Sequence, residues 1–174
     1  HSDIVALMVL QHQTKMHNVL TAANHSGRLT ARDAIVMNKA LERPVSFQSD
    51  STRRRYESAA EKVVKALLFC DEPPLTSPVG GTSSFTEDFQ KRGPFDSQGR
   101  SLRQLDLKQR LFAWPCSFLV YSDSFRSLPK GVLNRVHQRL EEILDGNDTS
   151  EDYRHLPATD RRAIREILNE TWPL

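Results

Sequence analysis

Residues 3–24, with the sequence DIVALMVLQHQTKMHNVLTAAN, decide the fold of this chain. At about 100° per residue, most apolar side chains of this segment fall within roughly 60° of one line along a helix. Such a stripe is typical of a helix that packs against a bundle core. The predicted stripe consists of Val5, Met8, Val9, His12, Met16, Val19, Leu20 and Ala23.

The first half of this helix carries apolar side chains on nearly every face. Ile4, Leu7 and Leu10 lie away from the stripe, so we expect this half to be central in the core. Gly27 is a candidate helix stop, and a second helix is predicted from about residue 30 to about residue 42.

Helical periodicity returns at several later positions. A third helix is predicted at 52–70, and Ser101 resembles a capping residue that reopens helical sequence. Further helices are expected to begin at Pro115, Pro129 and Pro157, and the last of them is expected to expose Arg161. No strand pattern of comparable strength appears. The sequence therefore predicts an all-α protein, a five- or six-helix bundle in a single domain over residues 1–174.

Residues 71–100 interrupt the helical pattern with frequent proline and glycine. A long irregular segment in a compact domain is typically a functional loop or a packed surface crossing. We expect an ordered crossing that forms part of a partner-binding surface, because exposed aromatic rings mark interfaces. The aromatic residues on which this expectation rests are Phe85, Phe89 and Phe95.

Composition excludes several classes of protein. The net charge of +2 does not favour nucleic acid, and the apolar run at 4–10 is far shorter than the roughly 20 residues of a membrane span. Cys70 and Cys116 match no zinc, redox or haem-attachment spacing, which leaves two free thiols or a single disulfide. The P-loop, Gly-x-Ser-x-Gly and His-Glu-x-x-His motifs are absent, so an enzyme is not the favoured interpretation.

His12 and Met16 lie one turn apart on the predicted stripe. In one interpretation His12 is a neutral core residue that is hydrogen-bonded to a hydroxyl or carbonyl group of a neighbouring helix, while Met16 fills the core. In the other, His12 or Met16 ligates a haem iron together with His137 from a second helix. We favour the packed core, and so no cofactor within this chain.

Two further segments contain more turn formers and aromatic residues than helix packing requires: GPFDSQGRSL at 93–102 and LFAWPCSFLVYS at 111–122. Together with residues 4–18, they resemble the C-terminal helical region of uncharacterised bacterial envelope proteins that accompany or carry c-type haem domains. The chain has no Cys-x-x-Cys-His motif, so the resemblance implies that covalent haem belongs to another segment or chain.

The resemblance implies a periplasmic or envelope location and a protein partner, with a c-type cytochrome domain as the candidate. A cytoplasmic location stays open. Three functions follow in order of preference: a non-catalytic binding or scaffold module of an envelope redox system, a haem-binding electron-transfer bundle, and an enzyme with an unrecognised histidine site.

Overall fold

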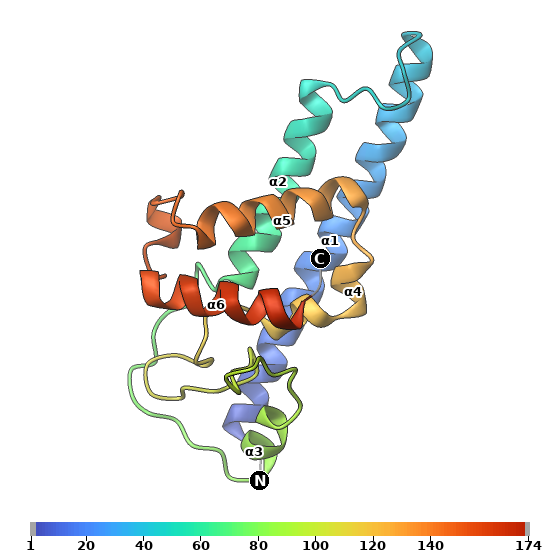
Figure 1. Cartoon of the computed structure of the whole chain (residues 1–174). Coiled ribbons are helices and arrows are strands. Elements are labelled where there is room, and N and C mark those ends of the chain that lie inside the picture. The colour runs from blue at the N-terminus through green and yellow to red at the C-terminus, as the bar shows by residue number, and fades with distance from the viewer. Residues whose placement is uncertain (1–2, 173–174) are drawn as a thin grey trace.

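A computed structural model describes residues 3–172 and confirms the all-α bundle (Figure 1). No strand occurs in this part of the chain, and an isolated antiparallel bridge joins Leu105 to Phe112. Within residues 3–172, two short 3-10 helices, η1 (Phe118–Tyr121) and η2 (Glu151–Tyr153), accompany six α-helices. The α-helices are α1 (Ile4–Ala40), α2 (Asp50–Leu67), α3 (Phe85–Gln90), α4 (Asp123–Arg126), α5 (Lys130–Leu144) and α6 (Ala158–Thr171).

Helix α1 is one continuous helix, so the prediction of a stop at Gly27 and of a separate second helix was wrong. The missing side chain of Gly27 allows close packing of α5. A Cβ atom at this position would lie 2.7 Å from Val132 Cγ2 and 2.8 Å from Pro129 Cγ. Glycine therefore permits the helix crossing at this position, although its helix propensity is low.

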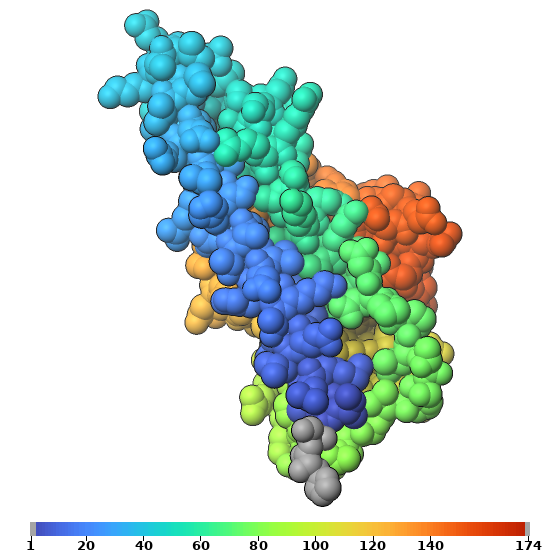
Figure 2. All heavy atoms as spheres, turned by 180° about the vertical axis from the view of Figure 1, so that it is seen from behind, coloured from blue at the N-terminus to red at the C-terminus, as the bar shows by residue number. Residues whose placement is uncertain are grey.

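The stripe of α1 is buried as predicted at six of its eight positions, whereas the expectation that its first half is central was wrong. Leu7 is 49% exposed and Val9 only 2% exposed. Figure 2 shows the reason: α1 lies on the outside along the full length of that face, so only one side of it meets the body. Ile4 and Leu10 are exposed on the outer side as well.

The far ends of α1 and α2 project beyond the crossing with α5 as a helical hairpin (Figure 1). Little covers this projection, and its end, which we call the hairpin tip, carries large exposed apolar side chains. The residues of the hairpin tip are Ile35, Val36, Met37, Leu41, Val45 and Phe47.

The segment 71–100 is an irregular crossing, as expected, and contains the short helix α3. Asp3 anchors it, because one oxygen of its carboxylate accepts hydrogen bonds from the amides of Thr82 and Ser83 and from the Ser83 hydroxyl. The predicted helix after Ser101 does not form. The chain turns back instead through Leu107, which has a positive φ of 58°.

The predicted helix after Pro115 is replaced by η1 and the single turn α4. Helices α5 and α6 begin close to the predicted positions and pack on one core cluster with α1 and α2. Arg161 is only 8% exposed, so its predicted outward orientation was wrong. Cys70 and Cys116 are both free thiols. No helix within residues 3–172 combines the length and apolar character needed to cross a membrane.

Candidate functional site around His12

His12 lies in an aromatic cage that three separate segments build. Its side chain is buried, with 4% of the residue exposed. The ring stacks on Phe69, with centroids 4.6 Å apart, and meets Phe112 edge-on at 5.5 Å. Phe69 follows α2 and has a positive φ of 58°, a conformation that turns the chain at the end of that helix.

Ser117 holds the imidazole on its other side. Its Oγ lies 2.7 Å from His12 Nε2 and also accepts the Leu119 amide at the start of η1. Within residues 3–172, the only acceptor in hydrogen-bond contact with the Ser117 hydroxyl is His12 Nε2. Ser117 therefore donates to Nε2, and the neutral ring carries its proton on Nδ1. Nδ1 is buried and has no hydrogen-bond partner in the described part of the chain.

Burial keeps the ring neutral. Burial, together with the smaller effect of the positive charge of Lys15, lowers the pKa of His12 from 6.5 to about 4. The Ser117–His12 distance is that of a nucleophile and its base, but Ser117 is fully buried. In the described part of the chain, no carboxylate binds Nδ1. The pair accordingly ties α1 to η1 and exposes no nucleophile.

A cavity of about 780 Å³, which we call the His12 cavity, opens beside the imidazole. This volume lies within the range of ligand pockets, roughly 300–1,000 Å³. Ser117 does not line it, so the cavity and the hydroxyl lie on different sides of the ring. Most of the wall is apolar and includes Met8, Phe69, Leu75, Leu111, Phe112 and Pro115.

The rim of the His12 cavity is polar and balanced in charge. Lys15 Nζ lies 3.1 Å from a carboxylate oxygen of Glu72. Arg110 is paired with Asp160, with 2.6 Å between the nearest nitrogen and oxygen. His155 joins from the loop before α6, where its Nε2 donates to the Leu68 carbonyl at 2.7 Å. These pairings leave the apolar wall as the main feature that a ligand would contact.

The other predicted cofactor residues lie elsewhere. His137 meets Trp172 edge-on, with centroids 4.7 Å apart, and burial lowers its pKa. Helix α5 reaches α1 at Gly27, which is about 22 Å along the helix from His12. The structure therefore does not bring His12 and His137 together. Met16 is fully buried in the core and does not line the His12 cavity.

The three predicted partner-binding rings differ in exposure. Phe89 is buried, and Phe85 is half-buried with its ring stacked on Phe89 at 5.5 Å. Phe95 is 48% exposed. Two of the three rings therefore anchor the 71–100 crossing to the core, and Phe95 is the one available to a partner.

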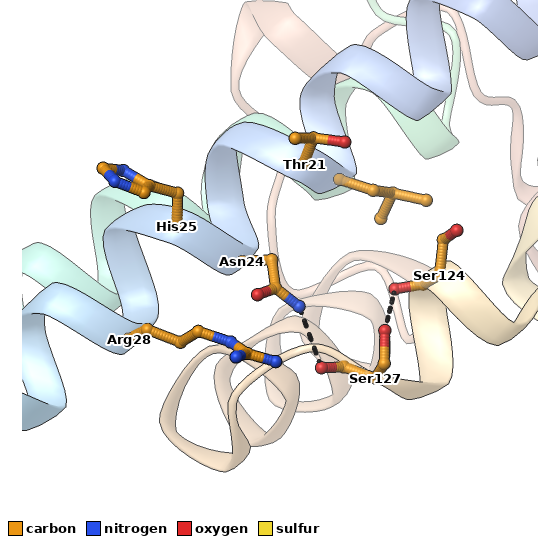
Figure 3. A pocket seen from close by; sticks show the side chains of 7 residues that line it. Thr21, Asn24, His25, Arg28, Ser124 and Ser127 are labelled. Carbon is orange, nitrogen blue, oxygen red and sulfur yellow. Dashed lines mark hydrogen bonds between the residues drawn. The ribbon is translucent and has the colours of Figure 1, made fainter.

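A smaller pocket of about 300 Å³ lies between α1 and α4 (Figure 3). Asn24 donates to the Ser127 carbonyl at 2.9 Å across it. In Figure 3, Arg28 extends toward Ser127, while the ring of His25, which also lines the pocket, points away from Ser127. These contacts join the end of α4 to α1.

Sequence reasoning singled out His12 but not the residues that surround it. Phe112 and Ser117 lie in the aromatic-rich stretch 111–122, and that density was the available signal. Phe69 and His155 carried no local signal, because their place beside His12 depends on how the chain leaves α2 and enters α6. In the comparisons with known proteins, no family model, no curated protein and no solved structure matches this chain.

Proposed function

We propose that this chain is a non-catalytic helical binding module whose His12 cavity receives an apolar group of a protein partner. The observation that carries the proposal is the mainly apolar wall of the His12 cavity, which has a volume of about 780 Å³. The hydroxyl partner of His12, Ser117, is fully buried. A buried pocket that takes an apolar anchor residue is a common centre of protein recognition.

The partner we propose is a c-type cytochrome domain in a bacterial envelope redox system. This part rests on the resemblance of residues 4–18, 93–102 and 111–122 to envelope proteins associated with such domains. The near-neutral charge of the chain is consistent with recognition through an apolar anchor rather than through strong electrostatic attraction.

The test is direct binding of purified c-type cytochrome domains from the organism that encodes this chain, measured by isothermal titration calorimetry. Leu75→Glu places a charge on a loop wall of the cavity, and we expect it to weaken binding at least tenfold. Val36→Glu, on the exposed hairpin tip, is the matched control and should bind like the wild type.

Each other outcome counts against the proposal. Equal binding by Leu75→Glu and wild type excludes the cavity, and loss with Val36→Glu alone moves the interface to the hairpin tip. Absence of binding by every cytochrome domain removes the proposed partner. An intense near-ultraviolet haem band in the purified protein would support the electron-transfer alternative. Hydrolysis of a test ester that His12→Gln abolishes would support the enzyme alternative.

A further inference from the structure

Arg103 is held in a fixed orientation by three groups. Its Nε donates to the Gly93 carbonyl at 2.9 Å. Its guanidinium carbon lies 4.3 Å from the ring centroid of Phe118 and 5.1 Å from that of Phe89. The guanidinium therefore rests on two aromatic rings, an arrangement that favours arginine over lysine.

The two terminal nitrogens of Arg103 have no protein partner in residues 3–172. Neither Nη1 nor Nη2 makes a hydrogen bond there, and no carboxylate lies within 4.0 Å. Neither nitrogen is fully buried in the described chain, so both are accessible to solvent. The half-buried guanidinium of Arg103 thus directs Nη1 and Nη2 toward solvent.

Other buried or partly buried arginines in the described part of the chain are paired with carboxylates or carbonyl groups. Arg100 pairs with Asp96 and Glu166, and Arg139 pairs with three carboxylates. Arg161 donates to four backbone carbonyl groups. Buried charges are normally paired, so Arg103 stands out as a cation with an open position for an anion.

The surroundings of Arg103 add a second charge and an apolar contact. Burial lowers the pKa of Arg103, and the positive charge of the nearby Arg92 lowers it as well. Arg92 has no carboxylate within 4.0 Å in the described chain. The exposed ring of Phe95 packs against Gly93, whose carbonyl holds Arg103. Two cations and an exposed aromatic ring therefore gather around Gly93.

We propose that Arg103 binds a carboxylate of an acidic segment on a protein partner, with Arg92 adding attraction and Phe95 contacting an apolar side chain beside that carboxylate. A fixed guanidinium can bind both oxygens of a carboxylate in parallel. Because its orientation is already set, binding costs less side-chain entropy than at a free surface arginine. This surface, which we call the Arg103 site, is separate from the His12 cavity and does not depend on the proposed function.

The test uses the acetylated and amidated pentapeptide Glu-Glu-Phe-Glu-Glu, titrated into the full chain at low salt by calorimetry. Arg103→Lys keeps the positive charge but removes the two guanidinium nitrogens that can bind both oxygens of a carboxylate. We expect this variant to weaken binding at least tenfold. Phe95→Ala should weaken it several-fold. A peptide with glutamine in place of glutamate should not bind. Arg162→Gln is the matched control, because Arg162 is exposed and has no carboxylate within 4.0 Å in the described chain.

Several results would overturn the proposal. Binding that is unchanged in Arg103→Lys would mean that charge alone attracts the peptide. Inorganic phosphate that binds as tightly as the peptide would indicate a site for a small free oxyanion. A Leu75→Glu variant that loses peptide binding would place the peptide in the His12 cavity. Side-chain ¹⁵N resonances of Arg103 that stay unshifted during the titration would place it elsewhere, even where a variant folds poorly.

Discussion

His12 Nε2 lies 2.7 Å from Ser117 Oγ, and this hydrogen bond joins residues 105 positions apart in the chain. Both side chains are buried, so neither can exchange its partner for water. The bond fixes the ring that forms the inner end of the His12 cavity. It also connects α1 to η1, because the same oxygen accepts the Leu119 amide.

Replacing Ser117 with alanine should destabilise the fold. His12 Nε2 would lose its hydrogen-bond donor in a buried place, which costs about 1–3 kcal/mol. Urea denaturation should show this loss in the free energy of unfolding. Ser127→Ala is the matched control, because its hydroxyl donates to Ser124 at an exposed position and should change stability by less than about 0.5 kcal/mol. Equal stability of the two variants would refute the role of Ser117.

The stability of the protein should fall in mild acid because of His12. The pKa of His12 is about 4 in the folded chain and 6.5 ordinarily, so the unfolded state binds the proton first. The contribution is complete above about pH 6.5 and is lost as the pH falls toward 4, with a total on the order of 3 kcal/mol.

This loss can be isolated by comparing wild type with His12→Gln in urea denaturation between pH 4 and pH 7. The difference in unfolding free energy between the two proteins should shrink as the pH falls, because only the wild type loses the histidine contribution. His25→Gln, at an exposed position, is the control and should track the wild type. A pH-independent difference between wild type and His12→Gln would contradict the proposed neutral state of the ring.

Helices with a sharp apolar stripe could be predicted from local sequence. Helices α5 and α6 follow proline and repeat apolar residues every three or four positions, and both appear close to the predicted bounds. The predicted helix end at Gly27 was wrong because the reason for glycine at this position is not local. Val132 and Pro129, which are distant in the sequence, occupy the space of the missing side chain. The predicted burial of Leu7 was wrong for a similar reason, since the apolar character of a residue does not show whether another element covers it.

The environment of His12 was predictable in part. The expected partner was a hydroxyl or carbonyl group, and Ser117 provides a hydroxyl. Its identity, and the contacts with Phe69 and Phe112, depend on loops that return to α1 from distant positions. The suggested pairing with His137 assumed that the two stripes face each other along their length. Helix α5 instead crosses α1 near Gly27, far from His12.

Gly27→Ala should destabilise the protein although alanine is the better helix former. Its methyl group would lie within 2.8 Å of atoms on Val132 and Pro129, so α5 would have to move. We expect a cost of about 1–3 kcal/mol in thermal or urea unfolding. The double variant Gly27→Ala/Val132→Ala should cost less than the sum of the two single variants, because the second change removes the closest atom. A stabilising effect of Gly27→Ala alone would show that the crossing of α1 and α5 accommodates a methyl group, and would contradict the prediction.

Arg161→Lys should be costly although it keeps the positive charge. The guanidinium donates to the carbonyl groups of Leu156, Ile143, Asp148 and Tyr153, and so binds the end of α5 to the loop that leads into α6. A lysine ammonium on an unbranched chain cannot reach all four oxygens, and the buried carbonyl groups left without a donor should cost roughly 3 kcal/mol. Arg162→Lys is the matched control at the next, exposed position, and should change the free energy of unfolding by less than about 0.5 kcal/mol. Amide hydrogen exchange provides a second measurement, because Arg161→Lys should accelerate exchange in the last turn of α5 more than in α1. Uniform protection in both helices, together with unchanged stability, would mean that the four contacts do not hold this corner of the fold.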